Sequence, residues 1–403
     1  MSSSSPQLRV HRRRVFYIPG YDPFHPRRYR ELYRKEGCKQ SELSGYKITV
    51  SAKSADGPYG WQVNSEQDGQ NVQGDVDVLV WSDIVRDSMS NSIASTYLQL
   101  ARTAWIYASS GALWRLMQLR KGPVIAALYP VGMLLFQLVA AVFVSWLVFS
   151  SLNPVSTWVA VSSAAISGYI VLGWFRRLDK KLFAYYLMHD YAYSARMWGM
   201  YAPELERRLE GFSALVEKAL RDDVDEVLVV GHSSGAHLGV SVLADVIRQG
   251  VPADGPELSF LSLGQVMPMV SFLPKAYRLR SDLNYLCASA DLTWVDVSAP
   301  GDGCAFALCD PVAVSGVSSS DKKWPLVLSA AFTQTLSAER WKALRWRFFR
   351  LHFQYLCAFD RPGDYDYFRV TAGPMTLADR FEGRAPSRSR IETAVSKFTS
   401  VSA

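Results

Sequence analysis

Charge is missing from a long central part of this 403-residue chain. From Gly122 to Phe175, 54 consecutive residues include no Asp, Glu, Lys, Arg or His, although charged residues make up 20% of the whole sequence. A run of this length does not arise by chance from ordinary soluble composition. Hydrophobic residues make up 49% of the chain, which excludes a disordered protein. The uncharged run therefore needs an explanation of its own.

Other absences exclude whole classes of protein. The five cysteines include no CxxC spacing, so the sequence predicts reduced cytosolic thiols, with no disulfide framework, no metal site and no cofactor. No GxxxxGK[ST] motif is present, which argues against an NTP-dependent protein. The first residues lack an apolar segment, so no secretory signal peptide is expected. The net charge of +7 suits an anionic membrane leaflet, and without a binding motif no nucleic-acid partner is expected.

Two apolar stretches fill the uncharged run. Val124–Phe149 supplies 26 residues and Val155–Phe175 supplies 21, and each exceeds the roughly 20 residues that a helix needs to cross a bilayer. The turn residues Ser150–Pro154 separate them. The sequence therefore predicts a transmembrane helical hairpin over 122–175, with the lipid bilayer as a partner. The alternative is a buried hairpin in a soluble core, where apolar runs are usually about half as long.

The hairpin carries signals for packing and orientation. Ala160, Ala164 and Gly168 recur every four residues, a stripe of small side chains that lets a second helix approach closely. Positive residues flank both outer ends and none lies in the turn, so both ends, both termini and the remaining chain are expected on the cytoplasmic side of the membrane. These positive residues are Arg115, Arg120, Lys121, Arg176, Arg177, Lys180 and Lys181.

The rest of the chain alternates between strand-like and helix-like segments. This order predicts an α/β fold with a mainly parallel sheet and helices on both faces. The expected strands include Arg14–Ile18, Tyr46–Ala52, Gly74–Val80, Glu226–Val230, Leu258–Gly264 and Leu292–Val297, and the expected helices include Ile93–Leu119, Ser234–Gln249 and Tyr277–Ala288. One domain, 14–121 and 176–380, would thus be interrupted by the hairpin, with disordered ends at 1–13 and 381–403.

One short motif in this domain is typical of a nucleophilic serine. Gly231-His232-Ser233-Ser234-Gly235 matches GxSxG, directly after an apolar strand and directly before a helix. A strand–turn–helix of this kind projects the serine hydroxyl from the edge of the sheet, while the glycines allow close packing. The start of the helix also places partial positive charge beside the serine. The context therefore favours a nucleophile elbow at Ser233.

At this motif the chain resembles the α/β-hydrolase superfamily, in which GHSSGAH is a form often seen in lipases and esterases. The resemblance implies that Ser233 is the nucleophile, that Gly231 and Gly235 shape the elbow, and that the backbone N–H of Ser234 is one oxyanion donor. The second donor of the superfamily follows an early strand. RVFYIPGYDP occupies that place here, with proline where a histidine is usual, which makes Tyr21 the candidate.

The superfamily order of serine, acid and histidine limits the other two catalytic residues. Only His237 and His352 follow the serine, and His237 lies one helical turn beyond it, so His352 is the candidate base. Asp302, in a glycine-flanked loop after an expected strand, is the candidate acid, with Asp296 and Asp310 as alternatives.

The residues around His352 also allow other interpretations. No glycine lies near it, so a buried structural histidine is the alternative to a catalytic base. Residues 340–351 mix five cations with four aromatic residues. Such a segment is typical either of a membrane interface or of an amphipathic element packed on the sheet.

These patterns predict a membrane-anchored serine hydrolase that acts through an acyl-enzyme on a hydrophobic or lipid ester. Two alternatives remain open. One is a non-catalytic interaction protein on the same scaffold. The other is an acyltransferase, because the same three residues serve transfer to an acceptor other than water. No substrate identity or oligomeric state follows from the sequence.

Overall fold

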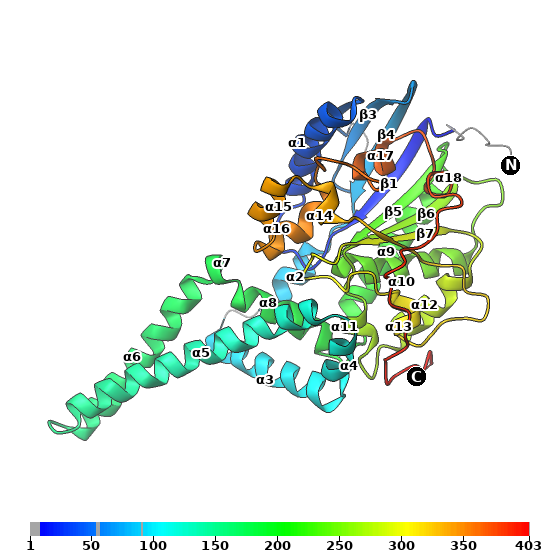
Figure 1. The fold of residues 1–403 in the computed structure, drawn as a ribbon. Coiled ribbons are helices and arrows are strands. Elements are labelled where there is room, and N and C mark those ends of the chain that lie inside the picture. Colours follow the sequence, from blue (N-terminus) through cyan, green and yellow to red (C-terminus); the bar gives the residue numbers. More distant parts are fainter. Residues whose placement is uncertain (1–8, 54–56, 90–91, 403) are drawn as a thin grey trace.

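In the computed structural model, which describes residues 9–53, 57–89 and 92–402, one eight-stranded mixed sheet organises the chain (Figure 1). The strand order is β2-β3-β4-β1-β5-β6-β7-β8. The strands are β1 Arg12–Ile18, β2 Lys47–Ala52, β3 Gly60–Gln67, β4 Gln70–Val78, β5 Glu226–His232, β6 Glu257–Leu263, β7 Thr293–Ser298 and β8 Leu326–Ser329. The expected α/β class and most of the expected strands are confirmed.

The sheet is mainly parallel. Strands β4, β1, β5, β6, β7 and β8 pair in parallel, and only the β2-β3-β4 meander is antiparallel. β5 lies near the centre, between β1 and β6. Because parallel strands end at the same edge, the segments after β1, β5, β6 and β7 gather at one side of the sheet, where α/β proteins place their sites.

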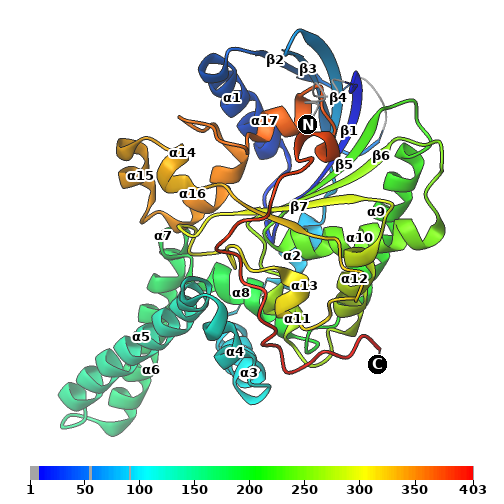
Figure 2. The same ribbon diagram turned by 45° about the vertical axis from the view of Figure 1, so that its right-hand side comes forward.

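Helices cover both faces of the sheet because alternate strand residues point in opposite directions. Phe16, Val229 and Phe260 point into one core with α9 (Pro203–Ala219), α10 (Ser234–Gln249) and α12 (Tyr277–Ala288). The opposite core lies against α1 and the short C-terminal helices (Figure 2). These are α1 Arg27–Ser44, α14 Phe332–Thr335, α15 Ala338–Leu344, α16 Phe348–His352, the 3₁₀ turn Phe353–Leu356, α17 Tyr367–Ala372 and α18 Leu377–Arg380. Two further short helices, α11 Pro268–Ser271 and α13 Pro311–Val314, follow β6 and β7.

A helical insertion separates β4 from β5. Two of its helices, α5 and α6, project from the body as a hairpin, and α3, α4, α7 and α8 surround its root (Figure 1). The helices are α2 Ser82–Ser88, α3 Ile93–Ser109, α4 Ala112–Leu119, α5 Lys121–Leu152, α6 Thr157–Arg177, α7 Asp179–Leu182 and α8 Ala184–Ala195. The helix expected over 93–119 is broken, because Gly111 adopts a φ of 76°.

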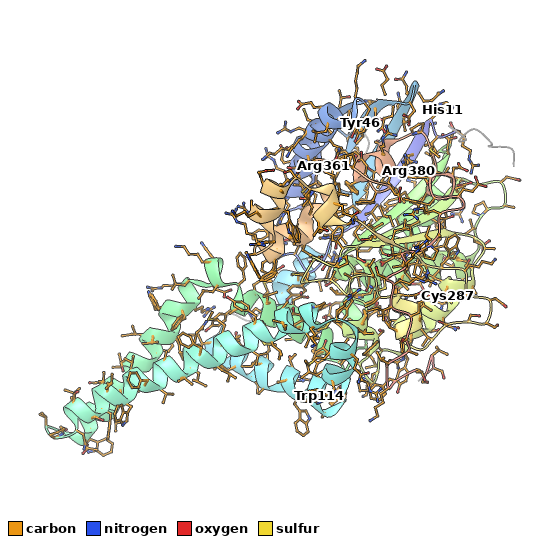
Figure 3. All side chains as sticks on the ribbon, in the orientation of Figure 1. His11, Tyr46, Trp114, Cys287, Arg361 and Arg380 are labelled. Carbon is orange, nitrogen blue, oxygen red and sulfur yellow. The ribbon has the colours of Figure 1, made fainter. Side chains whose placement is uncertain are left out.

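The hairpin exposes its apolar side chains. α5 and α6 are each long and apolar enough to cross a bilayer, and only 17% and 6% of their most apolar windows are buried. This exposure argues against the alternative of a buried core hairpin. Trp114 on α4, at the root, also points away from the body and is 67% exposed (Figure 3).

The expected stripe of small residues faces the other helix of the hairpin. Ala160 is fully buried, and a side chain at Gly168 would meet Ser145 Oγ at 2.5 Å. Ser145 Oγ donates a hydrogen bond to the carbonyl of Ala164 at 2.8 Å. The two helices therefore pack closely along the predicted face.

The two ends expected to be disordered differ from that prediction wherever the structure describes them. Val10 is fully buried and β1 begins at Arg12, whereas residues 1–8 lie outside the described residues. The tail forms little regular structure but has fixed partners: Ile391 N–H donates to the carbonyl of Leu308, and Arg280 Nε donates to that of Ser400. The prediction rested on amino-acid composition, which does not reveal such long-range contacts.

Candidate active site

The GxSxG motif forms a sharp turn between β5 and α10. Ser233 has φ 57° and ψ −123°, a conformation that residues with a side chain rarely adopt. A Cβ on Gly231 would lie 2.7 Å from Ala236 Cα, and one on Gly235 would overlap the carbonyl oxygen of Ile18. Both glycines are therefore required by close backbone approach, and the strained serine lies at the carboxyl edge of the sheet.

The loop after β1 lies directly against this serine. A Cβ on Gly20 would be 3.0 Å from Ser233 Cβ, so glycine lets the loop approach. Trp81 Nε1 donates to the carbonyl of Pro19 at 2.9 Å, and the Tyr186 hydroxyl on α8 donates to the carbonyl of Tyr21. The inserted helices thus help to position the loop.

The residues that follow Gly20 and Ser233 carry the two expected backbone donors. Within the described residues, neither the N–H of Tyr21 nor that of Ser234 has a hydrogen-bond partner. The first N–H groups of a helix have no acceptor within it, which explains the free donor at Ser234. Both expected oxyanion donors are therefore free N–H groups in the described part of the chain, as the binding of an anion requires.

Asp302 and His352 form a buried hydrogen-bonded pair. His352 Nδ1 lies 2.7 Å from Asp302 Oδ2, although the two residues come from different segments, the loop after β7 and the end of α16. The Tyr355 hydroxyl donates to the same oxygen at 2.9 Å, and the N–H of Cys304 donates to Oδ1 at 2.9 Å. Burial opposes ionisation of Asp302, but these partners outweigh it and lower the pKa of the carboxyl.

This pair fixes the tautomer of the neutral imidazole ring. Because the Asp302 carboxylate accepts, Nδ1 of neutral His352 carries the hydrogen and Nε2 presents a lone pair. Nε2 is buried and has no hydrogen-bond partner in the described part of the chain. His232, directly before the serine, places its ring centre 4.8 Å from that of His352 and bonds through Nε2 to the carbonyl of His352 at 3.0 Å.

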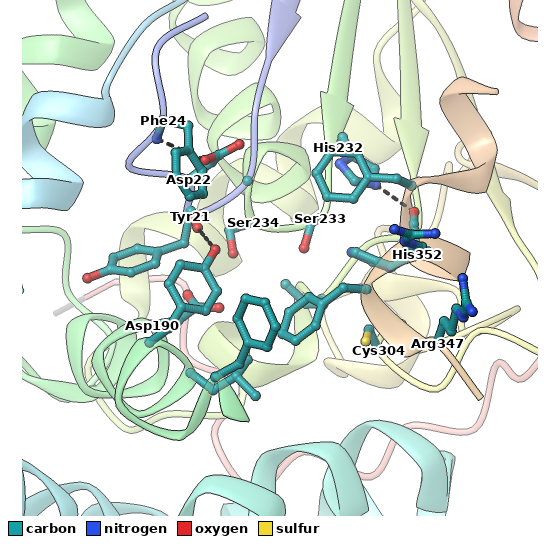
Figure 4. A pocket seen from close by; sticks show the side chains of 18 of the residues that line it. Tyr21, Asp22, Phe24, Asp190, His232, Ser233, Ser234, Cys304, Arg347 and His352 are labelled. Atoms are coloured by element: carbon teal, nitrogen blue, oxygen red, sulfur yellow. Dashed lines mark hydrogen bonds between the residues drawn. The ribbon is translucent and has the colours of Figure 1, made fainter. Parts of the chain in front are cut away.

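Ser233, His352, Tyr21 and Ser234 line one cavity of about 1440 Å³ (Figure 4). The cavity extends from the carboxyl edge of the sheet to α7 and α8, at the root of the hairpin. No hydrogen bond joins Ser233 Oγ to His352 Nε2 among the described residues, and such contacts are often long in empty sites. The structure thus brings together five residues that the sequence singles out, including Asp302 through its bond to His352.

The alternative residues lie elsewhere. Asp296 is fully buried within β7, where Oδ1 accepts from Ser262 Oγ at 2.6 Å and burial raises the pKa of the carboxyl to about 7. Asp310 caps the short α13 and pairs with Lys322 at 2.5 Å. His237 lies against Tyr201, outside the cavity lining. None of the three contacts His352.

Several residues of the site were not predicted from the sequence. Asp190 on α8 lines the cavity without a hydrogen-bond partner in the described residues, and burial raises the pKa of its carboxyl to about 7. Tyr355 bonds to Asp302, Tyr186 to the carbonyl of Tyr21 and His232 to the carbonyl of His352, and the last two residues also line the cavity. A faint signal exists for Tyr355, three residues after His352, and for His232 inside the motif. None exists for Asp190 or Tyr186, which reach the site only through the fold.

Metal binding is the other chemistry that these residues allow. Asp302, Cys304 and His352 offer ligand atoms within 4.8 Å of one another. However, Asp302 Oδ2 already accepts from His352 and Tyr355, and burial raises the pKa of the Cys304 thiol well above its ordinary value, so the thiolate form is disfavoured. The donor set therefore fits a hydrogen-bonded pair better than a metal.

The aromatic and basic segment before His352 is partly packed and partly exposed. Trp341 packs on the loop of Asp302, where a Cβ on Gly301 would lie 2.5 Å from its ring. Phe348 is 47% exposed but also meets this loop, since a Cβ on Gly303 would lie 3.2 Å from its ring. Trp346 is 73% exposed and faces outward.

No family model, curated protein or solved structure matches this chain.

Proposed function

We propose that the protein is a membrane-anchored serine hydrolase of the α/β-hydrolase type, in which Ser233, His352 and Asp302 form the catalytic triad. The observation that carries this proposal is the strained elbow at Ser233, in a cavity shared with a histidine whose free Nε2 is oriented by a buried carboxylate. A histidine with only a structural role does not require a strained serine nearby, and strained backbone conformations cluster at functional sites.

The geometry supports a two-step acyl transfer. His352 Nε2 takes the proton from Ser233 Oγ as that oxygen bonds to the ester carbon, and Asp302 stabilises the imidazolium. The C–O bond to the alcohol breaks, and the alcohol oxygen takes the proton from His352. Water, deprotonated by the same nitrogen, then bonds to the acyl carbon. The bond from that carbon to Ser233 Oγ breaks, Oγ recovers its proton from His352, and the acid leaves. The N–H groups of Tyr21 and Ser234 stabilise the negative oxygen in both steps.

The exposed hairpin supports membrane anchoring. α5 and α6 are joined by a short turn, and both outer ends return to the catalytic body (Figure 1). With cations at those ends and none at the tip, we place the body on the cytoplasmic side of the membrane. The cavity then lies at the root of the hairpin, within reach of a hydrophobic ester that stays in the bilayer.

A fluorophosphonate probe tests the nucleophile directly. We expect the purified full-length protein in detergent to react covalently at Ser233, because the probe needs a serine activated by a general base. Ser233→Ala should abolish labelling, and peptide mass spectrometry should locate the adduct. Ser51→Ala, an exposed serine on β2, is the matched control and should label as the wild type.

Absence of labelling in a folded protein would instead favour the non-catalytic interaction protein. Labelling that survives Ser233→Ala would remove Ser233 from the mechanism. Either result would overturn the proposal.

Tyr355→Phe tests the support of the acid. The change removes a hydrogen bond to the charged Asp302 and leaves the N–H of Ala299 without its 3.0 Å acceptor. A bond of this kind is worth about 1.5–3 kcal/mol, so we expect kcat to fall about 10- to 100-fold with KM little changed. Loss of the bond also destabilises the charged form of Asp302, so the pKa of that carboxyl should rise. An unchanged kcat would reduce Tyr355 to a packing role.

A further inference from the structure

The wall of the catalytic cavity carries an excess of unpaired positive charge. Six basic side chains that line it have no salt bridge and no side-chain hydrogen bond among the described residues. They are Lys35, Arg176, Arg177, Lys180, Arg347 and Arg350.

The four acidic residues of the same wall do not neutralise this charge, because two of them are already paired with arginines and the other two are outnumbered by the six cations. Asp22 pairs with Arg28 at 2.9 Å, and Glu36 pairs with Arg340 at 3.7 Å. Asp179 accepts from two N–H groups at the start of α8. Only Asp190 is without a partner in the described chain. The wall therefore presents cations to whatever enters the cavity.

Membrane topology explains only half of these cations. Arg176, Arg177 and Lys180 follow α6 and serve the positive-inside rule wherever they point. Arg347 and Arg350 are far away in sequence, yet they line the same cavity. Phe349 between them packs on Phe183 at the start of α8, with ring centres 5.0 Å apart. This contact brings α16 to the root of the hairpin.

The two arginines also belong to the segment that carries the catalytic base. α16 runs from Phe348 to His352, so Arg350 lies two residues before the imidazole. Arg347 and Arg350 are both exposed, so a group bound by them lies at the solvent-facing side of the cavity that also holds Ser233. Arginine recognises phosphate oxygens particularly well, since its planar guanidinium can donate two parallel hydrogen bonds.

We propose that the substrate is an acyl ester bearing a phosphate group, namely an anionic glycerophospholipid, and that its phosphate binds Arg347, Arg350 and the cations of the α6–α7 junction. This inference rests on the proposed hydrolase function and names its substrate class. The acyl chain extends towards the apolar parts of the cavity, and the ester carbon meets Ser233. Hydrolysis breaks the bond to the glycerol oxygen, which takes the proton from His352.

Binding to Ser233→Ala protein tests this proposal without relying on turnover. Full-length Ser233→Ala in non-ionic detergent is titrated with short-chain phosphatidic acid, which presents no charged surface, and with the uncharged diacylglycerol of equal chain length. Displacement of a fluorescent phosphatidic acid reports the affinity. We expect phosphatidic acid to bind at least about tenfold more tightly, and added salt to reduce the difference.

Charge variants locate the phosphate. Arg347→Gln with Arg350→Gln should remove most of the difference between the two lipids. Arg345→Gln is the matched control, an exposed arginine of the same segment outside the cavity lining, and should retain it. Arg347 and Arg350 are chosen because changes at Arg176 and Arg177 would also disturb membrane insertion.

The outcomes separate this inference from the proposed function. Equal binding of the two lipids, or an equal loss in Arg345→Gln, would overturn the inference while fluorophosphonate labelling could still succeed. Selective binding without labelling would overturn the hydrolase and leave the phosphate site. Tighter binding of an acyl phosphopantetheine thioester than of the lipid would assign the phosphate to a soluble acyl carrier and overturn the lipid assignment.

Discussion

Replacing Asp302 by asparagine is expected to lower kcat by about 10⁴-fold without unfolding the protein. Both carboxylate oxygens of Asp302 act only as acceptors, Oδ1 for the N–H of Cys304 and Oδ2 for His352 and Tyr355. An amide has a single acceptor oxygen. In the Asp302→Asn variant that oxygen accepts from Cys304 and the NH₂ group faces His352, which moves the ring hydrogen to Nε2. The imidazole then has no lone pair for the proton of Ser233.

Asp296→Asn is the matched control for this experiment. Asp296 is another buried carboxyl, on the strand that leads to the Asp302 loop, and burial raises its pKa to about 7. An amide replaces it with little change in shape and charge, so kcat should remain close to that of the wild type. Both variants are compared by steady-state hydrolysis of a chromogenic ester and by thermal unfolding. A larger loss in Asp296→Asn than in Asp302→Asn would make Asp296 the catalytic acid.

The elbow and the hairpin were predictable because both are local in sequence. The conformation of Ser233 depends on a strand, two glycines and a helix that are contiguous in the chain. The hairpin depends on uninterrupted apolar length. The parallel sheet followed from the alternation of segments, although β3 and β8 were not assigned, since β3 is polar and β8 has only four residues.

The supports of the site were not predictable because they join distant segments. Tyr186 reaches the carbonyl of Tyr21 across 165 positions, and Asp190 enters the cavity only because α8 packs beneath the loop after β1. Asp302 could be selected from its glycine-flanked loop, but only the fold shows that Asp296 points into the core. The role of the insertion was not predictable for the same reason, because α8 becomes one wall of the cavity only through the fold.

Breaking the buried ion pair at the opposite edge of the sheet is expected to have the largest effect on stability. Arg13 on β1 and Glu226 on β5 are 2.5 Å apart, and both side chains are fully buried. Glu226 also accepts from Ser259 Oγ and from the N–H of Leu377, each at 2.7 Å. Arg13→Met leaves a buried carboxylate without its cation, and we expect the free energy of unfolding to fall by about 3–5 kcal/mol.

An exposed ion pair of the same sheet provides the comparison. Lys47 and Glu66 are 2.7 Å apart on β2 and β3, with side chains 78% and 52% exposed. Lys47→Met should cost no more than about 1 kcal/mol, because water and salt screen the pair. Urea titration of the protein in detergent, followed by tryptophan fluorescence, measures both variants. Equal losses in the free energy of unfolding would show that burial does not determine how much the Arg13–Glu226 pair contributes to stability.

The same variants separate stability from catalysis. Arg13 and Glu226 lie at the amino end of their strands, whereas Tyr21 and Ser233 follow the carboxyl ends. Because the elbow is fixed by Gly231, Gly235 and the loop after β1, folded Arg13→Met protein should react with a fluorophosphonate at the wild-type rate well below its unfolding transition. A double change, Arg13→Met with Glu226→Met, removes both charges and should recover much of the lost stability. A reduced labelling rate in either folded variant would mean that this ion pair also positions the loop of Tyr21.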